Sequence, residues 1–139
     1  MIIKQFIRSI NLALIVFLFS GCGDSRVSEC RKIIIRVSSL QEKIQENLAS
    51  EDLDVIREIA QEFQVTGEQI TNDNFKDVIL NNYAQDLGLL YQEYAINTLN
   101  FISAFEVKDQ EKGILYQQQL INLFPQQEKL VNEINQYCQ

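Results

Sequence analysis

The three cysteines, Cys22, Cys30 and Cys138, are the residues whose chemistry says most about this chain. A cysteine thiolate can be acylated, oxidised to a disulfide or bound to a metal ion. Histidine, the usual general base and a common metal ligand, is absent from the sequence. The chain therefore has no Ser-His-Asp or Cys-His arrangement, and it has no glycine-rich phosphate loop. We predict a protein that is not an enzyme and that has no cofactor, no catalytic residue and no metal site.

Two acidic segments have part of the composition of a metal site. Glu58 and Glu62 are spaced by one helical turn, but ferritin-like bundles combine such glutamates with histidine. Residues 73–77 are rich in Asp and Asn like a calcium loop, but Phe75 stands at a ligand position, and the glycine and terminal glutamate of such a loop are missing. We interpret the glutamate pair as a solvated acidic face and exclude a calcium loop.

Residues 1–21 have the organisation of a secretory signal peptide. Lys4 and Arg8 are the only charged residues before an unbroken apolar run over residues 12–19. As a helix this run would span only about 12 Å, against roughly 30 Å for the hydrocarbon layer of a bilayer. A basic start, a short apolar run and small residues after it are typical of a signal peptide. The alternative is an uncleaved anchor helix, which Lys4, Arg8 and Asn11 would interrupt.

The segment Phe19-Ser20-Gly21-Cys22 resembles the lipobox of bacterial lipoproteins, whose usual form is Leu, a small residue, Gly or Ala, and then Cys. Three positions match, and Phe19 stands where Leu is preferred. The resemblance covers only the first 22 residues. It implies cleavage after Gly21, diacylglycerol on the Cys22 sulfur and often a further acyl chain such as palmitate. Two or three chains give lasting membrane attachment. The alternative is an ordinary cysteine beside a signal-peptidase site.

After the lipidated cysteine and a short polar tether (residues 22–29), residues 30–139 have the pattern of a helical domain. The sequence has one Pro and five Gly, and its apolar residues recur at spacings of three and four, as in amphipathic helices. We expect one helix over about 28–49, a second capped by Ser50, a third and longest over about 74–107, and a fourth that Pro125 kinks or splits. The predicted inward faces are Cys30, Ile33, Val37, Leu40, Ile44 and Leu48; Leu53, Ile56, Ala60, Phe63 and Ile70; Phe75, Ile79, Tyr83, Leu87, Leu90, Tyr94, Thr98, Phe101 and Phe105; and Leu120, Phe124, Val131, Ile134 and Cys138.

Short connections between these helices favour an all-α, up-down-up-down four-helix bundle, with a coiled-coil oligomer as the alternative. The start of the first helix and the end of the fourth share one end of such a bundle. Cys30 and Cys138 would then lie within disulfide-bonding distance, and export would place them in an oxidising compartment. The alternative is two separate buried thiols. The aromatic-rich stripe of the third helix is either core or the lining of a ligand pocket.

Charge is distributed unevenly along the chain, whose formal net charge is −7. A domain this acidic is repelled by phosphate backbones, so we expect no nucleic-acid partner. Residues 23–43 hold five basic and three acidic groups, whereas residues 44–139 hold five basic and sixteen acidic groups. The basic cluster beside the lipidated end would contact anionic headgroups, at about 1 kcal/mol per charge; alternatively, it pairs with acidic neighbours inside the bundle. This basic cluster consists of Arg26, Arg31, Lys32 and Arg36.

These observations favour an exported protein that is lipid-anchored to a bacterial membrane through Cys22, on its periplasmic or outer side. Its helical domain would be a non-catalytic binding or accessory module with a protein partner of unknown identity. One alternative is a carrier of a small apolar ligand in the bundle core. Another is a soluble intracellular interaction protein, if the N-terminus is not a signal peptide.

Overall fold

The computed structural model describes residues 25–47 and 50–139. Cys22, with the predicted signal peptide and lipobox, lies outside this range. The described residues form four helices and no strand: α2 (Ser25–Asn47), α3 (Leu53–Asn72), α4 (Val78–Glu106) and α5 (Gln110–Cys138). Helix α2 begins before the predicted start near residue 28, so most of the predicted tether is helical.

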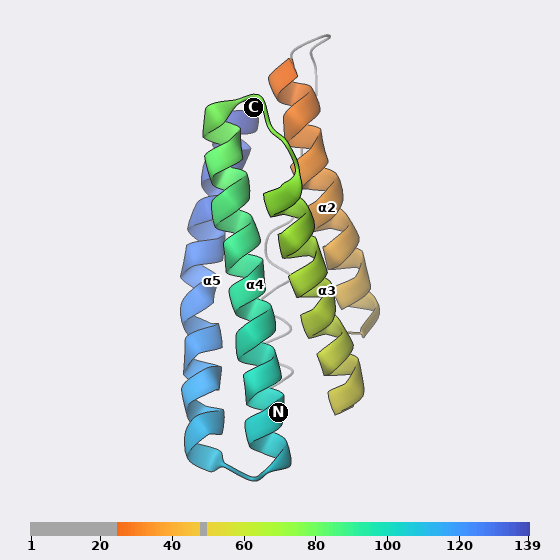
Figure 1. The fold of residues 1–139 in the computed structure, drawn as a ribbon, viewed down its shortest axis with the longest axis vertical. Coiled ribbons are helices and arrows are strands. Elements are labelled where there is room, and N and C mark those ends of the chain that lie inside the picture. The colour runs from red at the N-terminus through yellow and green to blue at the C-terminus, as the bar shows by residue number, and fades with distance from the viewer. Residues whose placement is uncertain (1–24, 48–49) are drawn as a thin grey trace.

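The helices run alternately up and down, which confirms the predicted four-helix bundle (Figure 1). The start of α2, the α3–α4 connection and the end of α5 all lie at one end of the molecule. The α4–α5 connection lies at the other end, where this hairpin extends beyond α2 and α3. Helices α4 and α5 both contain 29 residues, so the prediction that the third helix is the longest is wrong.

Three aspartates fix the starts of α3, α4 and α5. Asp52 accepts a hydrogen bond from the Asp54 amide, Asp77 accepts from the amides at 79 and 80, and Asp109 accepts from the Lys112 amide. A carboxylate at this position satisfies amides that have no partner within the helix. The cap of α3 is therefore Asp52 and not Ser50, whose hydroxyl accepts from the Asp52 amide. Because Asp77 caps α4 in the same way, α4 begins after Asp77, later than the predicted start near residue 74.

The predicted inward face of α2 is confirmed wherever the structure describes it. Its five members from Cys30 to Ile44 are all buried, while Leu48 lies outside the described residues. In α3, Ile56, Ala60, Phe63 and Ile70 are buried as predicted, and so are Leu120, Val131, Ile134 and Cys138 in α5. Helix α5 continues through Pro125, which is exposed, so of the two predicted effects, a kink or a split, the split does not occur.

The inward face of α4 agrees with the prediction only in part, since Leu87, Leu90, Tyr94 and Thr98 are buried as predicted. Ile79 and Phe105 were predicted to be buried, but they are 51% and 58% exposed. The face is broader than predicted and includes Gly88, which lies against Gly67 of α3 and which a pattern of large apolar residues does not detect. Phe105 also lies in the last turn of α4, in the hairpin that extends past its neighbours. The buried residues missed in α4 are Leu80, Ala84, Gly88, Tyr91, Ala95, Ile102 and Ala104.

Two glycines bring the backbones of α3 and α4 into close contact. A Cβ atom built on Gly67 would lie 2.6 Å from the carbonyl oxygen of Gly88, and one built on Gly88 would lie 2.7 Å from that of Gly67. No side chain fits at either position without a shift of backbone. Gly67 is thus part of a close backbone contact between α3 and α4.

Candidate functional site

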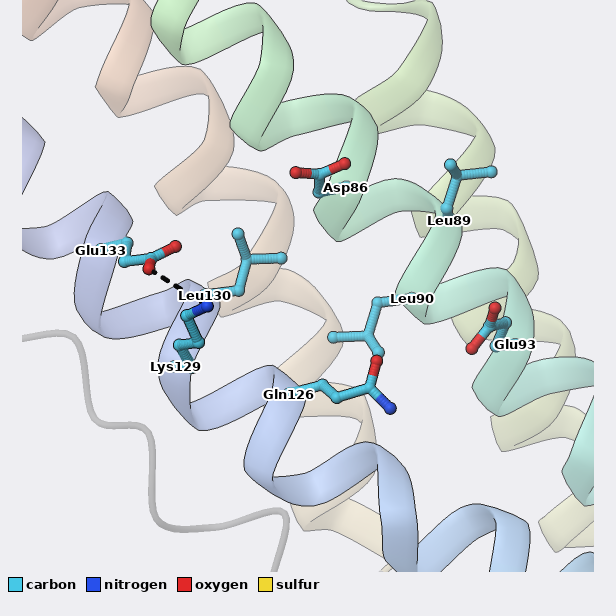
Figure 2. Close-up of a pocket in the computed structure, with 8 residues that line it drawn as sticks. All are labelled: Asp86, Leu89, Leu90, Glu93, Gln126, Lys129, Leu130 and Glu133. Atoms are coloured by element: carbon cyan, nitrogen blue, oxygen red, sulfur yellow. Dashed lines mark ion pairs between the residues drawn. The ribbon is translucent and has the colours of Figure 1, made fainter.

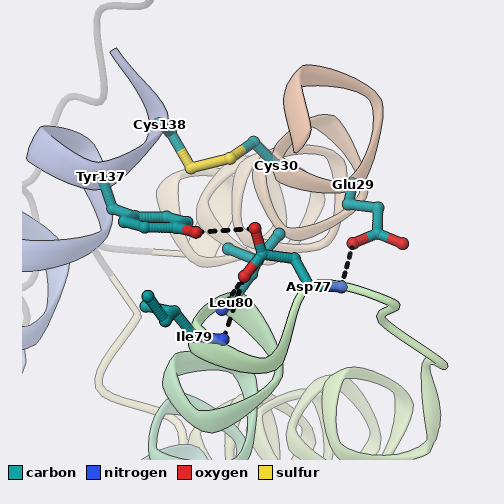
Figure 3. The surroundings of a disulfide bond; sticks show 7 residues. All are labelled: Glu29, Cys30, Asp77, Ile79, Leu80, Tyr137 and Cys138. Carbon is teal, nitrogen blue, oxygen red and sulfur yellow. Dashed lines mark hydrogen bonds between the residues drawn. A yellow bond between two sulfur atoms is a disulfide. The ribbon is translucent and has the colours of Figure 1, made fainter. Parts of the chain in front are cut away.

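Cys30 and Cys138 form a disulfide that joins the start of α2 to the end of α5 (Figure 3). The two sulfur atoms are 2.01 Å apart and the Cα atoms 6.0 Å apart. Both residues are buried. The predicted pairing is confirmed, and it closes the end of the bundle from which the chain continues toward Cys22.

Glu29, beside Cys30, binds the α3–α4 connection. Its carboxylate accepts hydrogen bonds from the amides of Lys76, at 2.8 Å, and Asp77, at 3.0 Å. These two bonds lower the pKa of Glu29, because they favour the charged form of the carboxylate. The residue is only 7% exposed, which is unusual for a glutamate. Glu29 thus fastens α2 to the start of α4.

Asp77 connects α4 to α5 at the same end. The Tyr137 hydroxyl donates a 2.6 Å hydrogen bond to Asp77 Oδ2, while Asp77 Oδ1 caps α4. The bond from Tyr137 is the largest cause of the lowered pKa of Asp77, and it raises the pKa of the Tyr137 phenol. The Tyr137 ring also packs on Tyr83 and lies beneath the Arg26 guanidinium. We call Glu29, Cys30, Asp77, Tyr137 and Cys138 the disulfide end.

The residues of the basic cluster take different positions beside the disulfide end. The Arg26 guanidinium lies 5.6 Å from the centre of the Tyr137 ring, and the Lys32 ammonium lies 5.8 Å from that of Phe75. Arg36 donates to both carboxylate oxygens of Asp73 and to Gln69. Arg36 therefore pairs with residues inside the bundle, as the alternative interpretation of the basic cluster predicts. Arg31 and Lys32 are exposed on α2.

The acidic candidates for a metal site are engaged elsewhere or exposed. Glu62 of α3 forms an ion pair with Lys43 of α2. Both residues line a shallow groove of about 230 Å³, which the exposed Glu58 also lines. In residues 73–77, Asp73 accepts from Arg36 and Asp77 from Tyr137. Across residues 25–47 and 50–139, no three acidic or cysteine side chains come close enough together to hold a metal ion.

Two tyrosines of the aromatic-rich stripe of α4 pack in the core, whereas Phe105 is exposed. Tyr91 and Tyr94 are buried, and their rings contact Phe63 of α3 at centroid distances of 5.5 and 5.2 Å. Burial raises the pKa of both phenols. Tyr94 also contacts Phe124 of α5. These contacts favour the core interpretation over a ligand pocket lined by the stripe.

A shallow groove of about 340 Å³ runs between α4 and α5 (Figure 2). Its apolar lining residues are Leu89, Leu90 and Leu130, of which Leu89 is exposed and points away from α5. Charged and amide side chains line its rims: Asp86 and Glu93 from α4, and Gln126, Lys129 and Glu133 from α5. Sequence reasoning missed this groove, because its residues come from helices whose register was predicted only from their buried faces.

None of the helices in the described part of the chain combines the length and the apolar character that crossing a membrane requires. Comparison with models of known protein families, with curated proteins and with solved structures finds no match to this chain.

Proposed function

We propose that this protein is an exported lipoprotein, anchored to a bacterial membrane through acyl chains on Cys22, whose helical bundle is a non-catalytic accessory module for a protein partner. The observation that carries the proposal is the buried Cys30–Cys138 disulfide. Disulfides persist in oxidising compartments and are rare in the cytosol. A signal peptide and lipobox before a disulfide-bonded domain are mutually consistent features of an exported protein.

The lipid anchor would hold the disulfide end of the bundle close to the bilayer. Helix α2 begins at Ser25, only three residues after Cys22, and three residues reach at most about 11 Å. Arg31 and Lys32 are exposed near the start of this helix, where anionic headgroups would attract them. The α4–α5 connection, at the opposite end of the bundle, would then point into the aqueous compartment.

Detergent phase partitioning of the chain expressed in bacteria tests the anchor. The wild type is expected in the detergent phase and a Cys22→Ala variant in the aqueous phase, since the substitution removes the acylated sulfur. A Cys30→Ser/Cys138→Ser variant is the matched control, because it loses two cysteines but keeps the lipid; it should stay in the detergent phase. Unchanged partitioning of the Cys22→Ala variant would rule out lipidation at this residue.

A further inference from the structure

We infer that the start of α4, beside the disulfide end, makes a second contact with the membrane, in which Val78 and Ile79 enter the surface of an anionic bilayer. The inference rests on the proposed lipid anchor, for which it names the surface of the bundle that meets the bilayer and the class of lipid. It goes beyond the basic cluster of α2, because Val78, Ile79 and the neighbouring Lys76 belong to α4 and the α3–α4 connection.

Val78 and Ile79 are an exposed apolar pair at the end of the bundle from which the chain continues toward Cys22. They are the first two residues of α4 and are 73% and 51% exposed. Helix α4 begins at the end where α2 begins and α5 ends (Figure 1). The Cα–Cβ bonds of a helix tilt toward its N-terminus, so both side chains tilt toward this end. Apolar side chains in this position can enter the boundary between headgroups and acyl chains.

Two exposed lysines lie next to the apolar pair. Lys76 precedes Val78 by two residues, and its side chain is exposed. Lys32 is exposed on α2, and its ammonium lies 5.8 Å from the centre of the Phe75 ring in the same connection. Lysines near a bilayer surface are attracted by anionic headgroups. Apolar and basic side chains together are the combination that favours the interface of an anionic membrane.

The carboxylates of this end are bonded within the bundle. Glu29 accepts hydrogen bonds from two amides of the α3–α4 connection, and Asp77 accepts from Tyr137 and caps α4 (Figure 3). Asp73 accepts from Arg36.

The charge of this end is opposite to that of the rest of the domain. Residues 25–36, 73–77 and 135–138 together contain five basic and three acidic side chains, whereas residues 44–139 contain five basic and sixteen acidic ones. A basic end on an acidic domain complements an anionic bilayer. Only three residues, reaching at most about 11 Å, separate Cys22 from the start of α2. Acyl chains on Cys22 would therefore hold this end beside the headgroups, where even a weak contact forms.

The test uses tryptophan as a reporter, because the sequence contains none. A Val78→Trp chain, purified from bacterial membranes, is placed in phosphatidylcholine vesicles with or without phosphatidylglycerol. Brominated acyl chains in these vesicles quench tryptophan that enters the apolar layer. Ile114→Trp is the matched control, since Ile114 is 68% exposed and lies near the start of α5, at the opposite end of the bundle.

The contribution of charge is tested by adding Lys32→Glu/Lys76→Glu to the Val78→Trp chain. Lys108→Glu/Lys129→Glu, which changes two exposed lysines elsewhere, is the control. In vesicles with phosphatidylglycerol the Val78→Trp reporter should shift its emission to the blue and be quenched, while the Ile114→Trp reporter should not. Lys32→Glu/Lys76→Glu should shift the equilibrium toward the free surface by at least roughly tenfold, and the control should stay within about twofold.

Quenching of the Val78→Trp reporter no greater than that of Ile114→Trp would overturn the inference. So would equal losses in the two charge variants. A blue shift without quenching would do the same, because a second copy or another protein would then cover the apolar pair. Flotation of the chain with the vesicles measures the anchor separately. A chain that floats without quenching refutes the contact and leaves the anchor standing, whereas a chain that does not float refutes the anchor and the inference that rests on it.

Discussion

The Glu29 carboxylate in the first turns of α2 accepts a hydrogen bond from the Asp77 amide, 48 residues later in the chain, at 3.0 Å. Asp77 in turn caps α4 and accepts a hydrogen bond from Tyr137, next to the disulfide-bonded Cys138. Three helices are thus joined at one end by hydrogen bonds as well as by a covalent bond.

This arrangement predicts that the bundle loses stability in acid. The pKa values of Glu29 and Asp77 are lowered from ordinary values of 4.5 and 3.8, so below these values the unfolded chain binds more protons than the folded chain. The stabilisation is therefore present above pH 4.5 and lost as the pH falls through the folded pKa values.

Urea unfolding at a series of pH values checks this dependence. A Glu29→Gln variant should be less stable than the wild type at neutral pH and should show a shallower decline in acid, because one titrating group has been removed. Glu42→Gln, an exposed change on the same helix, is the control. Identical acid profiles for the wild type and Glu29→Gln would show that this carboxylate does not couple folding to pH.

Replacing glycine by alanine should change the stability of the bundle in opposite directions inside and outside the close contact between α3 and α4. Alanine at Gly67 or Gly88 should destabilise the bundle by roughly 1–3 kcal/mol, because the new methyl group overlaps the backbone of the other helix. Gly113 in α5 has no atom within 4 Å of an added Cβ. Gly113→Ala should therefore stabilise by about 0.5–1 kcal/mol through helix propensity alone. Chemical denaturation measures all three, and a stabilising Gly67→Ala would refute the close contact.

Replacing Lys108, which follows α4, by glycine should stabilise the bundle. Lys108 has a φ of 58°, and its amide and that of Asp109 donate to the carbonyls of Phe105 and Ala104, the pattern of a Schellman motif. Glycine is preferred at this left-handed position, since any other side chain costs roughly 1 kcal/mol there. Lys108→Gly should raise the thermal midpoint, whereas Lys108→Ala, which keeps the strain, should not. Equal effects of the two would point to the lysine charge instead.

The disulfide predicts a large loss of stability on reduction. Because it closes a loop with a sequence separation of 108, removing it should lower the free energy of unfolding by about 2–5 kcal/mol. Guanidinium unfolding with and without reductant measures this change, and a Cys30→Ser/Cys138→Ser variant should be insensitive to reductant. Two reactive thiols in the unreduced wild-type chain would mean that the bridge does not form.

The spacing of large apolar residues predicted the four helices and the inward face of α2, and the short connections predicted the alternating directions of the helices. It also placed Cys30 and Cys138 at one end, because an even number of antiparallel helices brings the two chain ends together. The inward face of α4 was predicted only in part, since it also includes Gly88, which lies against Gly67 of α3, and the buried Ala84 and Ala95. Small side chains carry little hydrophobic signal, although they determine how close two helices come.

The disulfide end was only partly predictable. The cysteines carry a pairing signal of their own, but Glu29 and Tyr137 have common residue types, and their partners are brought to them by the α3–α4 connection. Nothing in the local sequence identifies a glutamate that binds two amides 47 and 48 residues away. The α4–α5 groove was missed for a related reason. It is lined by residues of two helices, and the spacing of apolar residues within each helix does not predict how the outward faces of the two helices align.

Mass spectrometry of the intact protein purified from bacterial membranes tests the lipid anchor most directly. We predict a chain that begins at Cys22 and is heavier than its amino-acid sequence by diacylglycerol, with or without a further acyl chain, and that has the mass of an oxidised Cys30–Cys138 pair. A chain that still begins at Met1, or one with an unmodified Cys22, would contradict the account.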